Sequence, residues 1–423
     1  MDSKRQPHVV FITCHDLGQH IGCYGVDTVD TPNLDGLATD GRRFENAVTT
    51  TPVCSPARGS LFTGQYPQTN GLLGLTHSPW WWRLDDGIAT LPELLGDAGY
   101  ETHLAGLQHV APDDDRLGFD HRHSTERDAT ETAAAARDIF ADAGDRPIYA
   151  QFGFFETHRG FNREPTDGDV FVPEYLQATD EMRTDLGRFQ AEIEFLDECV
   201  GELISGLEAE GVREETIVVF VADHGIPYPG AKWWCRDPGV EIALLMDGPG
   251  PTFDGDPIDA PISNVDVLPT VLDVLDIPVP DHVEGVSFHE YLAGETGTPP
   301  RDAAFTQYTD AGKEARGVVT AEYTLIRNFG PGRTVEYPVD TDPTSRAPSL
   351  GPATDPLPYS QLYDRRSDPY NLDDIAEERA DVTAALSDRV RAWMASVDDP
   401  LLRGGIRYPY QERATRDLLG AGE

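Results

Sequence analysis

Lysine is almost absent from this chain. Only three lysines, Lys4, Lys232 and Lys313, stand among its 33 basic residues, whereas 74 residues are acidic. The resulting net charge of −41 excludes nucleic acids and anionic membrane surfaces as partners, because both would be repelled. The acidic residues are spread along the whole chain rather than gathered in one tail, which indicates a solvated folded surface and not disorder.

High acid content with so little lysine is typical of proteins from salt-accumulating halophiles, and we expect a haloarchaeon-like source. In a cytosol with that much salt the Debye length falls to roughly 3 Å or less. The surface charge would then not repel a small anionic substrate. An ordinary acidic protein from a low-salt organism is the alternative.

Long apolar runs are also absent. No stretch reaches the roughly 18 consecutive apolar residues that a transmembrane helix needs. The first apolar run, residues 9–12, is too short for the core of a signal peptide, and no small-residue cleavage site follows it. We therefore expect a buried first strand and a cytoplasmic protein.

Cysteine is scarce and irregularly spaced. The chain has five cysteines, an odd number, and no CxxC pair, which argues against both a disulfide framework and a zinc site built from cysteine pairs. We expect Cys14, Cys23, Cys199 and Cys235 to be small buried hydrophobic residues. Cys54 is set apart by the motif around it.

Apolar, β-branched segments alternate with helix-like segments over the first 294 residues. Strands are expected at residues 8–13, 100–105, 147–154, 216–222 and 240–246. Helices are expected at residues 32–41, 56–63, 91–98, 130–143, 184–210 and 265–275. This alternation predicts an α/β fold with a mostly parallel central sheet and helices on both faces.

The pattern changes after residue 294. Two short strands, residues 315–320 and 323–328, precede a proline-rich loop that runs to Pro358, and a final helix is expected at residues 381–397. The sequence therefore predicts a catalytic α/β domain at residues 1–294 and a small α+β C-terminal subdomain at residues 295–423.

Four of the predicted strands are followed by polar residues that include a histidine. These residues are His15-Asp16, His109, His158 and Asp223-His224. Ligands of open α/β sheets bind beyond the carboxyl ends of the strands, so we expect these side chains to meet at one edge. A single such histidine would more readily be a core residue or a helix cap, but four converging endings indicate a site.

Two carboxylates and two imidazoles in this group have the chemistry of a divalent-cation site. Asp16 and Asp223 suit hard cations, whereas His15 and His224 shift the preference toward transition metals. The alternative is that both aspartates only cap the turns that follow their strands.

The most specific segment is Pro-Val-Cys-Ser-Pro-Ala-Arg-Gly-Ser-Leu-Phe-Thr-Gly, residues 52–64. Ser55 can serve as the N-cap of a short helix, with Pro56 at its first position and Gly64 at its end. Cys54 would then stand just before a helix N-terminus, where free N–H groups favour anions. Arg58, one turn further, can reach the same place with a bidentate guanidinium.

Cys-x-Pro-x-Arg followed by Leu-Phe-Thr-Gly resembles the signature of the sulfatases of the alkaline phosphatase superfamily, in which this cysteine is converted to formylglycine. Further matching segments are Thr-Pro-Asn-Leu-Asp at 31–35, Leu-Pro-Glu-Leu-Leu at 91–95, Asp-His-Gly at 223–225 and Leu-Tyr-Asp-Arg-Arg-Ser-Asp-Pro at 362–369. Residues 69–75 and 225–229 look most similar to the heparan N-sulfatase (sulfamidase) branch. The resemblance covers nearly the whole chain.

The resemblance implies a role for each residue that matches the family pattern. Arg58 would hold the formylglycine hydrate, and His109 would be the base that breaks the covalent sulfo-enzyme. His158 would bind the sulfate and protonate the leaving group, and Lys232 would bind the sulfate. One divalent metal, usually calcium in this family, would be bound by Asp16, Cys54, Asp223 and His224.

The same resemblance implies the partners of the chain. The substrate would be a small sulfated molecule, in particular a sulfated carbohydrate carrying an O-sulfate or N-sulfate. A formylglycine-generating enzyme would be needed to mature Cys54. One hydroxyl of the hydrate would attack sulfur, and deprotonation of the other would expel sulfate as the aldehyde reforms.

Two positions depart from the family pattern. His15 stands where most sulfatases have a first aspartate, so manganese, magnesium or zinc remains open beside calcium. Leu107 replaces a lysine that usually contacts the sulfate. We expect another donor to be recruited, for which Gln108, His77 and His15 are the nearest candidates in sequence.

Other interpretations stay open at this point. His224 also fits the phosphonate monoester hydrolases, so a phosphonate or phosphate ester hydrolase of the same superfamily is the first rival. A non-catalytic ligand-binding relative, suggested by Leu107 and His15, is the second. The segment Trp80-Trp81-Trp82 is either a stacking surface for a sugar or a hydrophobic plug over the sheet.

Overall fold

The computed structural model of this chain describes residues 6–123, 128–141, 144, 146–310, 313–330 and 357–419. The central sheet has seven strands in the order β2-β8-β7-β1-β6-β4-β5. Its strands are β1 His8–Cys14, β2 Arg42–Arg43, β4 Glu101–Gly106, β5 His121–Arg122, β6 Ile148–Gly153, β7 Thr216–Ala222 and β8 Leu244–Asp247. Strands β7, β1, β6, β4 and β5 run parallel, whereas β8 and β2 pair antiparallel.

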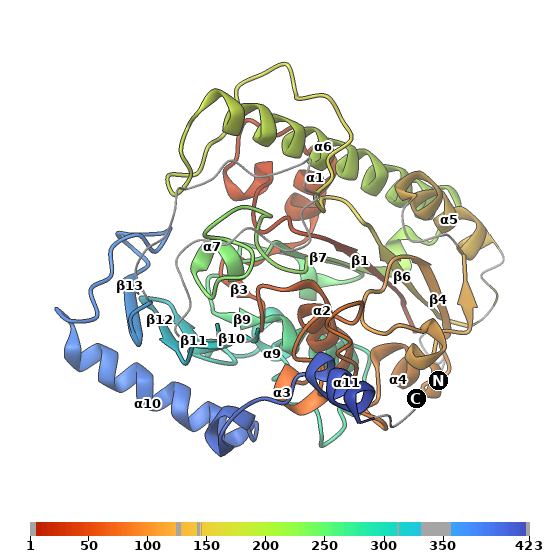
Figure 1. The fold of residues 1–423 in the computed structure, drawn as a ribbon. Coiled ribbons are helices and arrows are strands. Elements are labelled where there is room, and N and C mark those ends of the chain that lie inside the picture. Colours follow the sequence, from red (N-terminus) through yellow and green to blue (C-terminus); the bar gives the residue numbers. More distant parts are fainter. Residues whose placement is uncertain are drawn as a thin grey trace.

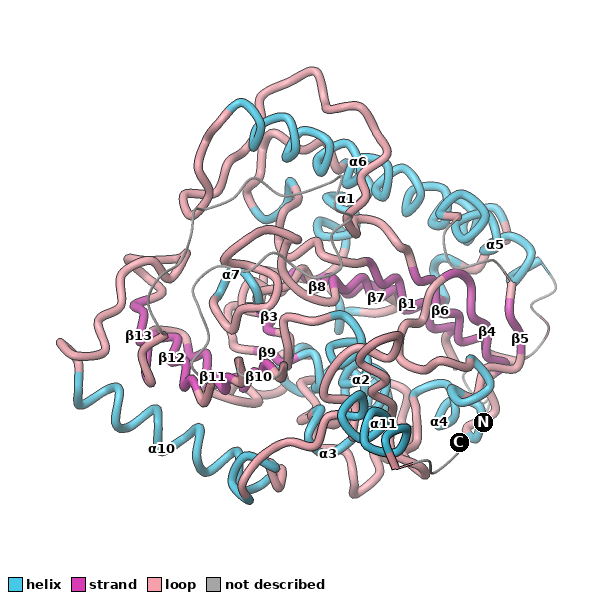
Figure 2. Tube along the Cα trace, viewed as in Figure 1, coloured by secondary structure: helices cyan, strands magenta, loops and turns pink. Residues whose placement is uncertain are grey.

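Helices cover both faces of this sheet, as the sequence predicts (Figures 1 and 2). Helices α1, α5 and α6 lie over one face, and α2 and α4 lie over the other. The helices are α1 Pro32–Asp40, α2 Cys54–Thr63, α3 Pro67–Asn70, α4 Leu91–Asp97, α5 Ala129–Ala141, α6 Asp180–Ala209, α7 Asp237–Val240, α8 Val267–Val274, α9 His289–Leu292, α10 Ala380–Ser396 and α11 Pro409–Leu418.

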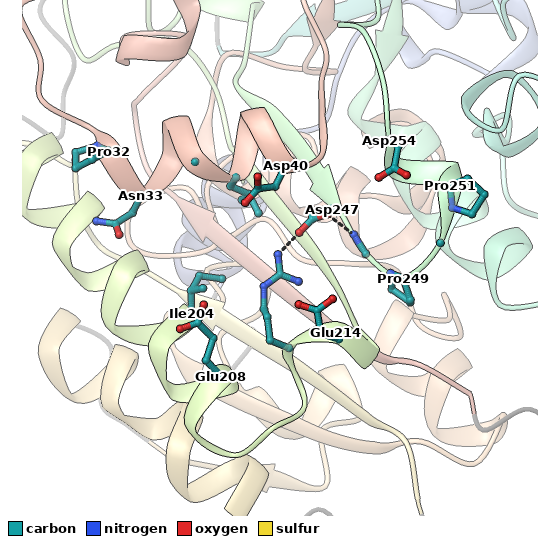
Figure 3. Close-up of a pocket in the computed structure, with 15 residues that line it drawn as sticks. Pro32, Asn33, Asp40, Ile204, Glu208, Glu214, Asp247, Pro249, Pro251 and Asp254 are labelled. Carbon is teal, nitrogen blue, oxygen red and sulfur yellow. Dashed lines mark hydrogen bonds and ion pairs between the residues drawn. The ribbon is translucent and has the colours of Figure 1, made fainter.

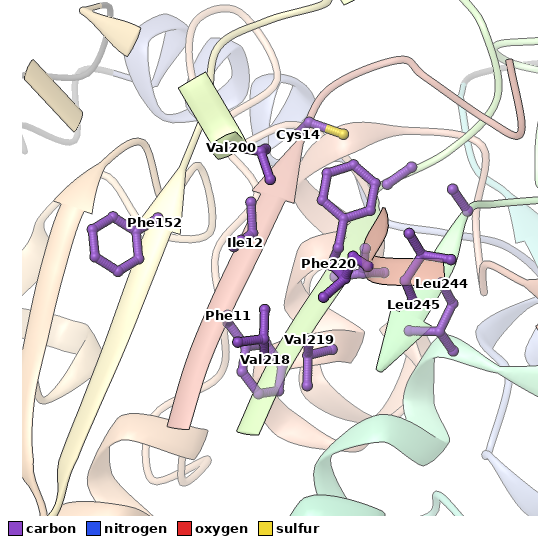
Figure 4. Close-up of a cluster of buried hydrophobic side chains, with 14 of the residues drawn as sticks. Phe11, Ile12, Cys14, Phe152, Val200, Val218, Val219, Phe220, Leu244 and Leu245 are labelled. Carbon is purple, nitrogen blue, oxygen red and sulfur yellow. The ribbon is translucent and has the colours of Figure 1, made fainter. Parts of the chain in front are cut away.

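The two central strands are buried along their whole length. Every residue of β1 and of β7 is buried, and Phe11, Ile12 and Phe220 lie in the main core (Figure 4). A parallel strand covered on both faces is read in sequence as a continuous apolar run. This is why the predicted bounds of β7, residues 216–222, are confirmed to the residue.

A smaller antiparallel sheet follows, formed by β10 Ala303–Tyr308, β11 Ala315–Thr320, β12 Tyr323–Asn328 and β13 Ser360–Asp364. Helix α10 packs on it, with Trp393 stacked on Phe305 at 5.1 Å between ring centroids. A two-stranded parallel sheet, β3 Ala47–Val48 with β9 Ile262–Ser263, lies beside the first strand of this sheet. The division at residue 294 stays a prediction, and most of the predicted proline-rich loop lies outside the described residues.

Four local predictions are wrong. Helix α2 begins at Cys54, so Ser55 is not its N-cap and its hydroxyl instead accepts a hydrogen bond from the Thr76 amide. Residues 240–246 were expected to be one strand, but β8 begins only at Leu244 and residue 240 ends α7. Helix α6 begins four residues before the predicted start. Cys23 is only partly buried, whereas Cys14, Cys199 and Cys235 are buried as predicted. Helix α11, in addition, has no counterpart in the prediction.

No transmembrane helix is predicted from the sequence. Among the described residues, no helix combines the length and the apolar character that crossing a membrane would require.

Candidate active site

The four predicted strand endings meet at the carboxyl edge of the sheet. His15 lies at the centre of this group, with ring centroids 5.4 Å from His109 and 5.3 Å from His158. Asp223 contacts both His15 and His224, and His224 also contacts Asp16. The meeting follows from topology, because β1, β4, β6 and β7 are parallel neighbours whose carboxyl ends share one edge.

Asp16, Asp223 and His224 present their polar atoms to one point. His224 Nε2 is 3.1 Å from Asp16 Oδ1 and 3.5 Å from Asp223 Oδ1. The His224 Nδ1 atom donates to its neighbour Gly225 O at 2.9 Å. A carbonyl can only accept, so Nδ1 carries the hydrogen and the Nε2 lone pair of a neutral ring faces the carboxylates.

This donor set fits a divalent cation. All three side chains are buried, and Asp16 and His224 have no exposed surface. Burial by itself raises the pKa of Asp223, but His224, His15 and Arg58 hold it well below its usual value. Burial by itself lowers the pKa of His224, but Asp223, Cys54 and Asp16 hold it well above its usual value. Without a metal, Nε2 would therefore carry a proton, and a bound cation would take the place of that proton and leave the ring neutral. Buried carboxylates that stay ionised need compensating positive charge, which a metal ion would supply.

His15 also fits such a site. Its Nδ1 atom is 2.9 Å from Asp223 Oδ2, yet neither ring nitrogen makes a hydrogen bond with the described residues. The two side chains thus approach closely without hydrogen-bond geometry, as two ligands that converge on one ion do. Burial and then Arg58 lower the pKa of His15 to about 3, so the ring is neutral and its lone pair is available.

Cys54 opens helix α2 beside the carboxylates. Its sulfur is 3.2 Å from His224 Nε2 and 3.9 Å from Asp16 Oδ1. Here Sγ occupies the place of the oxygens that a formylglycine hydrate would carry. The position is fixed at the other end of the helix, where Gly64 takes the left-handed conformation (φ 63°) and donates to Ser60 O.

Arg58 lies one turn after Cys54 on the same helix. Its Nε atom donates to Asp223 Oδ2 at 3.0 Å, and its Nη1 atom donates to Thr13 Oγ1 at 3.3 Å. Nη2 is buried and has no hydrogen-bond partner among the described residues. A buried N–H without a partner costs free energy, so this nitrogen is a candidate donor to a bound substrate or to the modified Cys54.

Lys232 brings a second positive charge into the site. Its Nζ atom donates to Asp16 Oδ2 at 3.0 Å, and the residue is 2% exposed. Asp16 therefore holds Lys232 on one oxygen and His224 on the other. Burial raises the pKa of Asp16, but Lys232, His158 and His224 bring it well below its ordinary range, so the carboxylate stays ionised.

His109 and His158 form the more open side of the site, because both are partly exposed. The Nδ1 atom of His158 donates to Arg159 O at 2.8 Å, which directs the other ring nitrogen away from the backbone. His109 lies within 4.8 Å of the Cys54 sulfur, measured between ligand atoms. The ring of His77 stacks on His109 at 5.5 Å and 6° between planes.

Two of these residues have strained backbones. Asp16 (φ 51°) and His109 (φ 56°) adopt the left-handed conformation, which non-glycine residues rarely take. Such conformations cost about 1–3 kcal/mol each and persist where the surroundings enforce them, often at functional sites. All nine predicted site residues are thus brought together, and their individual roles remain predictions.

The three consecutive tryptophans, predicted to be either a stacking surface for a sugar or a hydrophobic plug, differ in their surroundings. Trp82 is buried against Tyr408 in a separate core cluster, which supports the hydrophobic-plug interpretation for that residue. Trp80 is only partly buried and, with Trp233, packs on the cluster that contains Cys54. Trp81 lies under the guanidinium of Arg413 from α11, 4.3 Å from the ring centroid.

A cavity of about 770 Å³ lies elsewhere, at the opposite edge of the sheet (Figure 3). Its lining includes Asp40, Glu208, Glu214, Asp247 and Asp254, and the only basic side chain in that lining, Arg213, is already paired with Asp247. Excess negative charge disfavours an anionic substrate. This cavity is therefore a poor candidate for an anion site, and the carboxyl edge is the candidate active site.

Sequence reasoning missed the residues that hold the site from behind. Gln151 Nε2 donates to Thr13 Oγ1 at 2.9 Å, and Thr13 in turn accepts from Arg58. Both lie inside apolar strands, so a polar residue in a buried run was the available signal. Gln108, a candidate replacement for the missing lysine, instead binds the backbone of residues 110 and 111.

Comparison with known proteins identifies the family of this chain. The family model described as Sulfatase matches residues 7–277, and the model for N-sulphoglucosamine sulphohydrolase, C-terminal, matches residues 230–347. Human N-sulphoglucosamine sulphohydrolase is 27% identical over 94% of this chain and 91% of its own length. An ulvan-active sulfatase of Formosa agariphila is 29% identical over 80% of this chain and 75% of its own.

Solved structures share the fold. The putative sulfatase yidJ from Bacteroides fragilis superposes with a TM-score of 0.76 at 22% identity, covering 95% of this chain and 98% of that one. A structure in complex with its substrate D-glucosamine-2-N,6-O-disulfate gives 0.72 at 19% identity, over 93% and 98%. Because the Sulfatase model matches well over half of the chain, this protein belongs to the sulfatase family, whose members hydrolyse sulfuric esters.

Proposed function

We propose that this chain removes sulfate from a sulfated sugar, through a formylglycine made from Cys54 and one divalent metal. The observation that carries the proposal is the position of the Cys54 sulfur, 3.2 Å from His224 Nε2 and 3.9 Å from Asp16 Oδ1. A divalent metal and formylglycine are general in the sulfatase family. The donor atoms around Cys54 are those that such a pair requires.

The proposed metal ligands are Asp16, Asp223, His224 and the modified Cys54, with His15 as a further ligand. Calcium is the usual ion of the family and suits the carboxylates. The two imidazoles add affinity for manganese or zinc, and magnesium is the third alternative to calcium. A bound cation supplies Lewis-acid stabilisation of charge at the reacting oxygen.

The residues around Cys54 divide the remaining work. Arg58, through its buried Nη2, would hold the formylglycine hydrate. Lys232 and His158 would bind the sulfate and offset the negative charge that grows on its oxygens. His158 would give a proton to the leaving oxygen or nitrogen of the sugar. His109 would take a proton from the formylglycine hydrate so that sulfate departs and the aldehyde is restored.

A sugar as the substrate is supported by the aromatic side chains at the site. Trp80 and Trp233 come from two different loops, and both are partly exposed while packing on the cluster that contains Cys54. Flat apolar rings beside polar groups suit the faces of a sugar. Relatives named for N-sulphoglucosamine and for ulvan point to the same class.

The first test compares sulfated compounds with phosphorus esters. An aryl sulfate, glucosamine N-sulfate, an aryl phosphonate monoester and a phosphodiester are offered to the matured protein. We expect kcat/KM for a sulfated compound to exceed that for both phosphorus esters at least roughly 100-fold, about 2.8 kcal/mol of transition-state stabilisation. The Cys54→Ala variant gives the background rate for each compound.

The opposite preference would favour the phosphonate or phosphate ester hydrolase, for which the Asp223-His224 pair is the supporting observation. A protein whose Cys54 is converted to formylglycine but which hydrolyses none of the four compounds, nor a panel of sulfated saccharides, would favour the non-catalytic relative.

A second prediction concerns Leu107, which replaces the usual lysine. Leu107 is 7% exposed, so a lysine there would lose hydration, and where another donor already fills the role of the usual lysine it would also meet crowding and like-charge repulsion. We expect Leu107→Lys to leave kcat/KM on an aryl sulfate unchanged or lower. Leu107→Met, which conserves volume without charge, controls for crowding. A gain of tenfold or more, about 1.4 kcal/mol, would show that the natural site lacks a charge and that no donor replaces the lysine.

A further inference from the structure

A second group of histidines lies at the amino edge of the sheet, away from the proposed catalytic residues. Strand β4 contributes Glu101 and His103 near its start, and the edge strand β5 begins with His121 and is followed by His123. His103 pairs with His121 in the parallel register. Because side chains two residues apart on a strand share a face, all four point to the same side.

The atoms of this group are spaced as metal ligands. Glu101 Oε1 is 3.0 Å from His121 Nε2 and 3.6 Å from His103 Nε2, and ligand atoms of the three residues all lie within 4.8 Å of one another. Zinc–ligand bonds of about 2.0–2.1 Å in a tetrahedral site place two ligand atoms about 3.3 Å apart. The two separations from Glu101 bracket that value, and the third, between the two histidines, is at most 4.8 Å.

A buried atom without a partner faces this point. His103 is 6% exposed, and its Nε2 makes no hydrogen bond with the described residues. Its Nδ1 atom lies 2.9 Å from His123 Nε2. If Nδ1–H donates to His123, the lone pair of His103 Nε2 is turned toward Glu101 and His121. Histidines that bind metals are commonly oriented in this way by a bond from their other nitrogen.

The surroundings admit an ion. Glu101, His103, His121, His123 and Asp138 line one cavity of about 190 Å³. Arg146 is the one arginine or lysine among the described residues that line this cavity, and its side chain, 60% exposed, approaches the other oxygen of Glu101 at 3.7 Å. Arg146 pairs with Oε2 of Glu101, whereas the histidines face Oε1, so Oε1 is not taken by this ion pair. An exposed ion pair of this kind also contributes little free energy.

We propose that Glu101, His103 and His121 bind one divalent transition-metal ion that ties the edge strand β5 to β4. Two imidazoles and one carboxylate favour zinc, copper or nickel over calcium and magnesium. Three protein ligands leave a fourth position for water. The ion would fasten the two-residue strand β5, and it would take no part in the reaction at the opposite edge.

The test titrates Zn²⁺ into the full-length, matured protein with its active-site metal already bound. Isothermal titration should show a Zn²⁺ site in the parent that His121→Ala weakens at least tenfold. His121 is half exposed, so its loss should leave the fold and kcat/KM unchanged. His282→Ala, the loss of an exposed histidine away from the group, is the matched control and should bind as the parent does.

Hydrogen exchange tests the tether. Zn²⁺ should slow amide exchange in β4 and β5 of the parent and of His282→Ala, but not of His121→Ala. Equal Zn²⁺ affinity in the parent and His121→Ala would overturn the site. Site-specific binding with no protection of β5 would overturn the proposed tether.

Discussion

Replacing Cys54 by alanine should lower kcat on any sulfated substrate by at least roughly 10⁴-fold, as removal of a nucleophile does in other enzymes. The loss is expected because alanine cannot be oxidised to the aldehyde whose hydrate would attack sulfur. The metal ligands Asp16, Asp223 and His224 would remain in place. Steady-state rates measure the effect, and mass spectrometry of the peptide containing Cys54 measures conversion of the parent to formylglycine.

A matched control separates chemistry from packing. Cys199 is 3% exposed and lies in the main core on α6, so Cys199→Ala removes the same atom from an equally buried place. It should cost stability but little activity. Cys54→Ser should be inactive unless the host supplies a maturase that accepts serine. Full activity of Cys54→Ala would disprove the nucleophile and, with it, the proposed mechanism.

Replacing Asp223 by asparagine should remove both the bound metal and the activity. Asp223 Oδ1 accepts from the Asp16 amide at 2.9 Å, and Oδ2 accepts from Arg58 Nε at 3.0 Å. An amide replaces one of these oxygens by an NH₂ group that cannot accept, and it removes the negative charge. Loss of a residue that only hydrogen-bonds to a metal ligand already costs about 10–100-fold in metal affinity or activity. For Asp223, a proposed ligand itself, we expect at least a roughly 100-fold loss in metal affinity and in kcat/KM.

Asp399→Asn is the matched control for Asp223→Asn. Asp399 is fully buried and pairs with the buried Arg316 at 2.6 Å, in the C-terminal sheet. Both variants break a buried ion pair and should lower the melting temperature. After chelation, adding back the metal should restore the activity of Asp399→Asn. It should not restore the activity of Asp223→Asn, which can no longer bind the metal. A chelated, metal-free parent that retains its full rate would contradict the proposed metal dependence.

Much of the active site could be predicted because its residues follow strands that are unmistakable in sequence. A buried parallel strand is a continuous apolar run, and the polar residues after it are found by counting. The α/β fold and the family are therefore confirmed, and the nine predicted residues do meet. The halophilic source and the cytoplasmic location rest on composition and N-terminal sequence alone and stay predictions.

The direction of β8 and the position of α11 could not be predicted from local sequence patterns. Strand β8 runs antiparallel because the segment between Ala222 and Leu244 turns back without crossing the sheet. Periodicity is the same for both strand directions, so it cannot report this. Helix α11 is amphipathic but has no buried residue, and the segment before it is held by Tyr408 packing on Trp82, more than 300 residues away in sequence.

Local motifs are enough to identify the chemical groups of this site, since Cys54, Arg58 and the four strand-end histidines all stand in such motifs. Which of these groups face one another depends on the folded chain. Local spacing fixes a side chain on its own strand, whereas pairing between strands depends on sheet order and register. Glu101 and His103 stand well before His121 in the chain, and only the register of β4 with β5 makes them neighbours.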